Sequence, residues 1–186
     1  MIVFKVDEQL ELRQLQESDA APLFDVIVRN RSYLRDWMPW LDTTQRPEDT
    51  LEFIRTTLQQ AEKGDGFVAG IWYNGSIVGT IGFQKVDWLN RNVEIGYWIT
   101  ADCQGKGIVT RACKVFIDHA FNEWQLHRVQ IRCATGNARS CKIPERLGFT
   151  REGHQRQAEF LYGKYVDLVI YGMLSDEWKT HRLRIP

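Results

Sequence analysis

The sequence predicts one α/β domain on a mixed, mostly antiparallel sheet, and three observations support this prediction. The chain has 186 residues, of which 44% are hydrophobic and 26% charged, as in an ordinary globular domain. Its apolar pattern changes from a helical period to alternation after residue 66. The dipeptide Asn74-Gly75 then joins two alternating runs, which indicates a β-hairpin. No repeat or linker divides residues 1–186, so we expect one domain with a C-terminal tail from about residue 176.

The first part of the chain is predicted to form one strand and two helices. Residues 10–16 alternate roughly between apolar and polar side chains, which is typical of a strand. Ser18 can cap the first helix, and Pro39 ends it. In the second helix, Pro47 suits the first turn and Gly64 suits the position after the last turn.

The rest of the chain is predicted to hold most of the sheet. Two strands flank the hairpin turn, and residues 93–99 form a third. A helix follows the Gly-rich turn at 104–107, residues 127–135 form a strand, and residues 138–148 form a short helix. Two strands complete the domain, the last of them over residues 165–174. The expected order is strand, helix, helix, three strands, helix, strand, helix, two strands.

Charge and cysteine content argue against several classes of protein. Lys plus Arg and Asp plus Glu number 24 each, so the basic excess typical of nucleic-acid or anionic-membrane binders is absent. No apolar run approaches the ~18 residues that span a bilayer, and no signal peptide is recognised. The four cysteines form no CxxC pair, and the four histidines lack ligand spacing. We expect a cytoplasmic protein with no metal, no nucleic-acid partner and no membrane partner.

Residues 102–114, DCQGKGIVTRACK, place two glycines and a lysine before an apolar-periodic run. The first turn of a helix has unpaired N–H groups and a partial positive charge. Glycines let an anion approach these groups, and Lys106 adds a full charge, so the turn suits a phosphate or pyrophosphate. A P-loop needs GxxxxGK before Ser or Thr, and a dinucleotide fingerprint needs glycine where Thr110 stands. From these residues alone, a plain helix start remains the better-supported alternative.

The turn resembles the acetyl-CoA pyrophosphate signature of the GCN5-related N-acetyltransferase (GNAT) superfamily, Gln/Arg-x-x-Gly-x-Gly/Ala. The six places are filled by Gln104, Gly105, Lys106, Gly107, Ile108 and Val109. The predicted order of elements is similar to the family's over nearly the whole chain. The segments EIGYWI, GKGIVT, NARSCKIPERLGF and RQAEFLYGKYVD together resemble the Rim-type (RimJ/RimL-like) branch. That branch acetylates N-termini of ribosomal proteins and includes relatives with other amine substrates.

The resemblance implies a GNAT-like fold and transfer of an acetyl group from acetyl-CoA to a primary amine. The acceptor is expected to be a protein N-terminal α-amine or a small amine, which attacks directly in a ternary complex. A homodimer is expected because the family often dimerises. Two alternatives stay open at this point: a catalytically silent CoA-binding sensor or scaffold on the same fold, and a nucleotide- or dinucleotide-binding protein.

By the same resemblance, coenzyme A is expected to contact a strand, the Gly-rich turn and a later loop. The backbone of Trp98 and Ile99 would hold the pantetheine arm where this strand splays from its neighbour. The amides of residues 104–110, which end at Thr110, would hold the pyrophosphate. Val109 replaces a small residue of the family signature, so its side chain must point away from the cofactor. The amide of Asn137 matches the pantetheine amides, and a turn or cap role is the alternative.

Acyl transfer from a thioester needs a neutral amine, an oxyanion donor and a proton for the departing thiolate. The resemblance assigns the base to Glu159, whose neighbour Phe160 would help to form an apolar wall that raises its pKa. An ordinary surface glutamate is the alternative. Glu94 is the second candidate base, or else a partner in a cross-strand ion pair. Ser140 is expected to donate to the thiolate sulfur, or to cap a helix.

An aromatic cluster of Tyr33, Trp37 and Trp40 lies between the first two predicted helices. The resemblance places these helices beside the acceptor groove, so the three are predicted to bind substrate, with a core or interface role as the alternative. Cys133 and Cys141 raise a covalent acyl-cysteine route. No histidine lies close to either in the sequence, so both are expected to be buried apolar residues.

Overall fold

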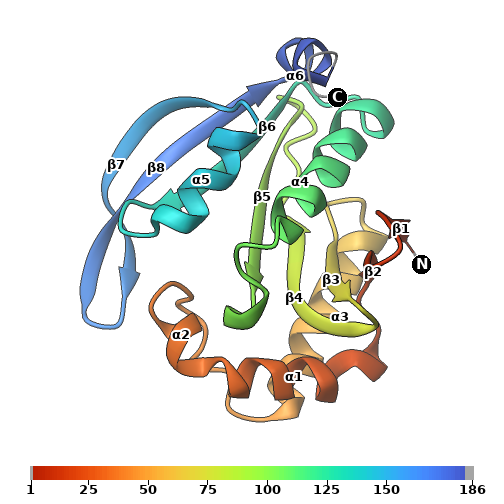
Figure 1. Ribbon diagram of the computed structural model, residues 1–186, viewed down its shortest axis with the longest axis vertical. Coiled ribbons are helices and arrows are strands. Elements are labelled where there is room, and N and C mark those ends of the chain that lie inside the picture. Colours follow the sequence, from red (N-terminus) through yellow and green to blue (C-terminus); the bar gives the residue numbers. More distant parts are fainter. Residues whose placement is uncertain (1, 183–186) are drawn as a thin grey trace.

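In the part of the chain that the structure describes, eight strands form one sheet in the order β1-β2-β3-β4-β5-β6-β8-β7 (Figure 1). The structure is a computed structural model that describes residues 2–182. Neighbouring strands are antiparallel except β5 and β6, which are parallel, so the predicted mixed, mostly antiparallel sheet is confirmed. The strands are β1 (Val3–Lys5), β2 (Leu10–Gln14), β3 (Val68–Tyr73), β4 (Ser76–Phe83), β5 (Asn92–Ile99), β6 (Arg128–Ala134), β7 (Thr150–Leu161) and β8 (Lys164–Leu174).

Within the described residues, the helices are α1 (Ala20–Arg29), α2 (Arg31–Arg35), α3 (Pro47–Glu62), α4 (Ile108–Asp118), α5 (Ala138–Arg146) and α6 (Ser175–Arg182). A π-helical turn over His119–Glu123 prolongs α4. The first predicted helix is divided in two, because the Asn30 side chain interrupts it. Its amide donates to the Val26 carbonyl at 2.9 Å, and its oxygen accepts the Ala101 N–H at 3.1 Å.

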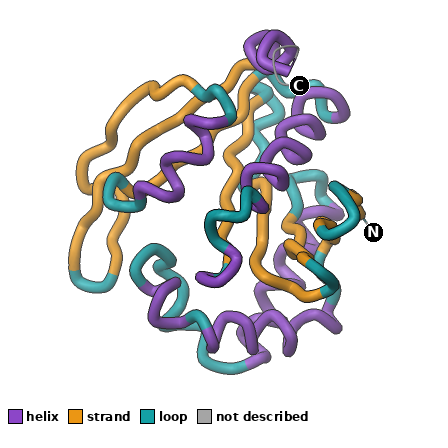
Figure 2. The backbone as a smooth tube through the Cα atoms, viewed as in Figure 1, coloured by secondary structure: helices purple, strands orange, loops and turns teal. Residues whose placement is uncertain are grey.

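Alternation along β5 directs side chains into two separate cores. Trp98 packs into the cluster that includes Leu23 of α1 and Ile54 of α3. Its neighbour Ile99 packs into the larger cluster that includes Phe116 of α4. Helices therefore cover both faces of the sheet, as the tube in Figure 2 also shows. The Asn74-Gly75 turn between β3 and β4 has φ angles of 49° and 77°, as the predicted two-residue hairpin requires.

Strands β5 and β6 separate along their length. They pair only from Asn92 opposite Arg128 to Glu94 opposite Gln130. Beyond Glu94, β5 keeps β4 as its neighbour while β6 continues against β8. This is the splay that the resemblance implies, and it leaves one backbone edge of β5 unpaired at residues 95–99, where the site is built.

The two ends of the chain add elements that the sequence patterns do not reveal. Strand β1 has three residues, too few for a periodic signal, and pairs Phe4 with Leu12 of β2. The predicted tail from about residue 176 is helical as far as it is described. Trp178 of α6 is 2% exposed, and its Nε1 donates to the Asp118 carboxylate at 2.7 Å. The rest of that tail, residues 183–186, lies outside the described residues. None of the described helices has the length and hydropathy to cross a bilayer.

Candidate active site

The Gly-rich turn presents a row of free backbone donors. Gly105 and Gly107 have φ angles of 74° and 70°, in the left-handed region that favours glycine. Within the described chain, the N–H groups of residues 105–110 donate to no other protein group, whereas that of Gln104 donates to the Ala101 carbonyl at 3.3 Å. A Cβ at either glycine would meet no atom within 4 Å, so the donors are open to a ligand. This arrangement suits the binding of an anion at the start of α4.

Two larger side chains in this turn face away from the donors. Ile108 is 1% exposed and Val109 is 7% exposed, and both belong to the core beneath α4. Only the backbone of these two residues therefore faces the open side of the turn, where the free N–H groups lie. Val109, which stands where the family signature has a small residue, therefore does not obstruct the free N–H groups.

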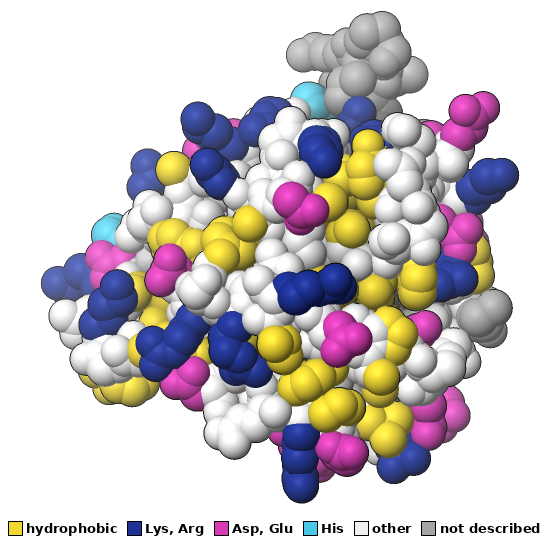
Figure 3. Space-filling model, turned by 60° about the horizontal axis from the view of Figure 1, so that its bottom comes forward, with side chains coloured by type: hydrophobic (Ala, Val, Ile, Leu, Met, Phe, Trp, Pro, Cys, Tyr) yellow, Lys and Arg dark blue, Asp and Glu magenta, His cyan; other side chains and the backbone are white. Residues whose placement is uncertain are grey.

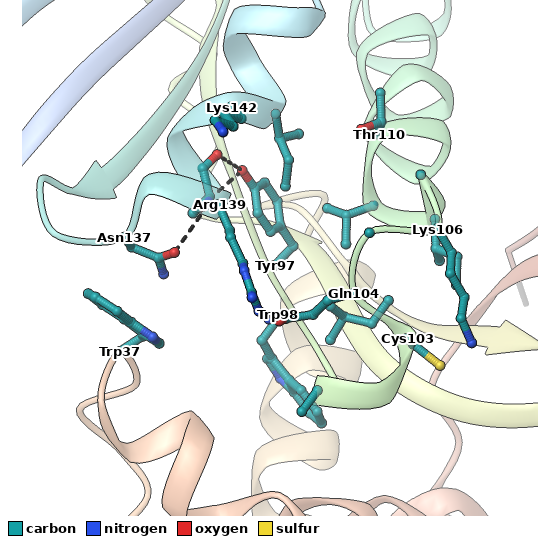
Figure 4. A pocket seen from close by; sticks show the side chains of 18 of the residues that line it. Trp37, Tyr97, Trp98, Cys103, Gln104, Lys106, Thr110, Asn137, Arg139 and Lys142 are labelled. Atoms are coloured by element: carbon teal, nitrogen blue, oxygen red, sulfur yellow. Dashed lines mark hydrogen bonds between the residues drawn. The ribbon is translucent and has the colours of Figure 1, made fainter.

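A cavity of about 1010 Å³ runs beside this turn, between α4, α5 and the free edge of β5. Figure 4 shows Gln104 and Arg139 in contact across it, where Arg139 donates to the Gln104 side-chain oxygen. The side-chain nitrogen of Gln104 in turn donates to the Tyr33 hydroxyl. Of the described residues that line it, none is acidic. The lining residues that carry positive charge are Lys106, Arg111, Lys114, Arg139, Lys142 and Arg146. This first cavity suits a polyphosphate.

A second cavity of about 1180 Å³ lies on the other side of β5, next to α3 and the loop after α2. Among its lining residues are two basic side chains, Lys85 and Arg132. The acidic ones are Asp49, Glu52, Glu94 and Glu159. The second cavity therefore has the opposite charge to the first, although acidic and basic side chains are interspersed over the face drawn in Figure 3.

The two cavities meet at the start of α5. The residues that line both are Trp37, Met38, Tyr97, Trp98, Asn137 and Ser140. The Ser140 hydroxyl lies 3.4 Å from the Tyr97 hydroxyl and 3.3 Å from the Cys133 sulfur. Asn137 caps α5, since its Oδ1 accepts the Ser140 N–H at 3.1 Å (Figure 4). The capping alternative for Asn137 is thus present, and its side-chain nitrogen donates to no group of residues 2–182.

Tyr97 is a residue of this junction that sequence reasoning did not single out. It is half-buried, and its hydroxyl also donates to the Ser140 carbonyl at 3.3 Å. Burial raises its pKa well above the ordinary value, so the phenol stays protonated. The available signal was its alternation with Ile95 and Ile99 on one face of β5, toward the start of α5.

The two candidate bases differ in their partners. Glu94 accepts hydrogen bonds from Arg132 Nε at 2.7 Å and from Gln130 Nε2 at 3.1 Å, which is the ion pair with the neighbouring strand given as its alternative. Glu159 is half-buried, and its carboxylate forms no hydrogen bond or ion pair with any described residue. Desolvation raises the pKa of Glu159, nearby Glu94 raises it further, and Arg132 opposes both. Glu159 is therefore the carboxylate available to an incoming proton.

The expected apolar wall beside Glu159 is only partly present. Phe160 is 55% exposed and packs against Tyr165 with tilted rings whose centroids are 5.0 Å apart, so it does not shield the carboxylate. Successive residues of a strand face opposite sides, which explains the difference. Leu161 is buried, and the Tyr162 hydroxyl donates to the Met38 carbonyl at 2.6 Å. This bond ties the β7–β8 hairpin to the loop after α2.

The predicted aromatic cluster is divided between the cavities. Tyr33 lines the first cavity and not the second. Trp40 lines the second, with its ring 6.1 Å from that of Trp98. Trp37 lines both cavities. Its ring lies next to the loop before α5, since a Cβ added at Gly136 would be 3.6 Å from it. Trp37 and Trp40 thus line the acidic second cavity, whereas Tyr33 lies on the side of the Gly-rich turn.

The cysteines are buried and unpaired. Burial raises the pKa of Cys133 to about 12, so its thiol stays protonated near neutral pH. Cys141 lies 3.7 Å from the Ala134 carbonyl. Burial and a protonated thiol are features of small core residues, not of a nucleophilic cysteine. No group of His, Cys, Asp and Glu side chains among residues 2–182 is arranged to hold a metal ion.

Comparison with known proteins assigns this geometry to a family. Residues 9–150 match the family described as Acetyltransferase (GNAT) domain. The putative ribosomal N-acetyltransferase YdaF of Bacillus subtilis (strain 168) is 38% identical, over 98% of this chain and 100% of its own length. The ribosomal-protein-serine acetyltransferase of Escherichia coli (strain K12) is 33% identical, over 92% of this chain and 96% of its own.

Solved structures are similar over nearly their full length. RimL, a ribosomal L7/L12 alpha-N-protein acetyltransferase in complex with coenzyme A, has a TM-score of 0.91 at 26% identity, over 95% of this chain and 99% of its own. The microcin C7 self-immunity acetyltransferase MccE, in complex with acetyl-CoA and AMP, has a TM-score of 0.88 at 30% identity, over 92% and 95% of the two chains.

Proposed function

Because the chain belongs to the GNAT acetyltransferase family and uses acetyl-CoA to acetylate a primary amine, we propose that its acceptor is the N-terminal α-amine of a ribosomal protein. The observation that supports this most is a pair of oppositely charged cavities that meet at Ser140. A basic cavity suits the polyphosphate donor, and an acidic one suits an ammonium acceptor. The relatives named as ribosomal-protein acetyltransferases indicate which amine.

Coenzyme A would occupy the first cavity. The free amides of residues 105–110 would bind its diphosphate, and the basic side chains around them would neutralise the charge. The pantetheine arm would run along the unpaired edge of β5 at Trp98 and Ile99, past the Asn137 amide, to Ser140. The thioester then lies where the two cavities meet.

The acceptor would reach the thioester from the second cavity, past Trp37 and Trp40. Glu159, directly or through a water, removes a proton from the ammonium group, and the neutral amine attacks the thioester carbonyl. Free N–H groups on β5 stabilise the oxyanion that forms. When the carbon–sulfur bond breaks, the electron pair leaves with sulfur, and the Ser140 hydroxyl, which Tyr97 holds in place, donates a hydrogen bond to the thiolate. The amine nitrogen loses its second proton to water as the amide forms, and the thiolate takes up a proton from water, so Ser140 stays neutral.

The acceptor assignment is tested by a panel of peptides that carry the N-terminal sequences of ribosomal proteins. Thiol release from acetyl-CoA is measured together with the mass of each peptide. We expect release with at least one free N-terminus and none when the same peptide is N-terminally blocked. Turnover only with small amines such as polyamines would refute the ribosomal acceptor but not the acetyltransfer activity.

Direct attack predicts different consequences for the two side chains that lie 3.3 Å apart at the junction. Ser140→Ala removes the donor to the thiolate and is expected to lower kcat about tenfold, the value of one hydrogen bond of roughly 1.4 kcal/mol. Cys133→Ala should leave kcat near that of the wild type. Thiol-release kinetics and the mass of the enzyme after acetyl-CoA treatment check both. An acetyl group on Cys133, or loss of turnover in Cys133→Ala, would instead show an acyl-enzyme route.

We also propose that the protein works as a homodimer in the cytoplasm. Ribosomal acceptors support the location. Exposed apolar side chains are available for a dimer interface, among them Leu89, which is 93% exposed, and Trp88, which is 45% exposed. Sedimentation at several concentrations measures the state of association, and a monomer throughout would exclude the dimer.

A further inference from the structure

Strand β7 departs from regular pairing immediately before Glu159. Glu159 pairs with Val166, whereas the three residues before it, 156–158, lie opposite Asp167 alone. In an unbroken antiparallel ladder Val166 would face Gln157. The bulge therefore places the side chain of Glu159, and not that of Gln157, opposite Val166 and beside the second cavity.

Asp167 holds the bulge through its side chain. Its Oδ1 accepts the Gln157 N–H at 2.7 Å, and this bond is the main reason that the pKa of Asp167 lies below its ordinary value. Its Oδ2 contacts His154 Nε2 at 2.9 Å. Gln157 has a φ of 51°, which a residue other than glycine seldom adopts without support. The carboxylate of Asp167 supplies that support.

The same residue also reaches the other half of the site. The backbone carbonyl of Asp167 accepts the Thr135 N–H at 2.9 Å. Thr135 follows β6 and begins the loop that leads to Asn137 and Ser140. Asp167 thus contacts both the bulge that precedes Glu159 and the loop that carries Ser140, although it lines neither cavity.

We propose that Asp167 is a positioning residue for acetyl transfer, which places the Glu159 carboxylate at the thioester through its bond to the Gln157 amide. The inference rests on the proposed role of Glu159 as the base. Asp167 touches neither the amine nor the sulfur. Its contribution is to the geometry of proton removal, where a displacement of about 1 Å can cost 10²-fold in rate.

A double-mutant cycle tests this proposal. Asp167→Ala removes the acceptor for the Gln157 N–H and is expected to lower kcat about 10- to 100-fold without changing acetyl-CoA affinity. Asp167→Asn keeps an oxygen at that position and should stay close to the wild type. In the Glu159→Gln background, Asp167→Ala should cause no further loss, because residues that act as a unit are not additive. Thiol-release kinetics measure kcat, and calorimetry measures the affinity for acetyl-CoA.

Two further variants keep the test decisive. Glu152→Ala removes a β7 carboxylate that pairs with Arg128 at the other register shift of the strand, between Arg151 and Gly153, and it should leave kcat unchanged. If Asp167→Ala does not fold, Asp167→Glu, which displaces the acceptor oxygen by one methylene, replaces it in the cycle. An additive loss in the Glu159→Gln background, or full activity of Asp167→Ala, would overturn the positioning role. Full activity of Glu159→Gln alone would instead refute the proposed base.

Discussion

Replacement of Glu159 by Gln is expected to lower kcat about 10²- to 10⁴-fold while acetyl-CoA binds as before. Glutamine has nearly the same shape but cannot take a proton from the ammonium group. The carboxylate forms no hydrogen bond or ion pair with any described residue and lines only the second cavity, so the change disturbs neither the fold nor the first cavity. Thiol-release kinetics give kcat, and calorimetry gives the affinity for acetyl-CoA.

The pH dependence of kcat also tests whether Glu159 is the base. Glu159 acts as a base when ionised, and burial raises its pKa, so activity should rise as the pH increases through that raised pKa. Glu159→Gln should lose this rising limb. Glu94→Gln is the matched control: it removes a neighbouring charge that raises the pKa of Glu159, so the limb should move to lower pH with a smaller loss of kcat. The reverse ranking of the two variants would assign the base to Glu94.

Replacement of Gly107 by Val is expected to raise the apparent KM for acetyl-CoA about 10- to 100-fold and to change kcat at saturation little. A β-branched residue at a φ of 70° is strained by about 1–3 kcal/mol, and every 1.4 kcal/mol is tenfold in affinity. Relief of that strain turns the peptide groups on either side, which are among the donors proposed to bind the diphosphate. Initial rates across acetyl-CoA concentrations measure the change.

Gly64 provides a control with the same backbone conformation. Its φ is 71°, it lies after α3, and a Cβ there would also meet nothing within 4 Å. Gly64→Val should therefore lower thermal stability to a similar extent as Gly107→Val but leave the KM for acetyl-CoA unchanged. Equal KM values for the two variants would show that strain at residue 107 does not reach the cofactor.

Features fixed by a few neighbouring residues were predictable from the sequence. The Asn74-Gly75 hairpin and the glycines before α4 follow from backbone conformations that few other residues adopt. The buried orientation of Val109 follows from the helical period that begins there. In each case the cause and the effect lie within a few residues of one another.

Features that depend on distant contacts were not predictable. The β7 bulge depends on Asp167, ten residues beyond the amide that it binds, and no composition signal marks Gln157 as left-handed. The place of Tyr33 in the first cavity follows from the bend at Asn30, which a Pro39-terminated helix does not suggest. The contact between the hydroxyls of Tyr97 and Ser140 joins β5 to α5, which are distant in the sequence.

The central claim is that the free amides of residues 105–110 bind the diphosphate of coenzyme A, and NMR titration of the ¹⁵N-labelled protein tests it most directly. We expect the amide signals of these residues to shift strongly on addition of coenzyme A and to shift little with equal concentrations of ATP or NAD. Unmoved signals at residues 105–110 together with saturable binding elsewhere, or a preference for ATP, would contradict the claim.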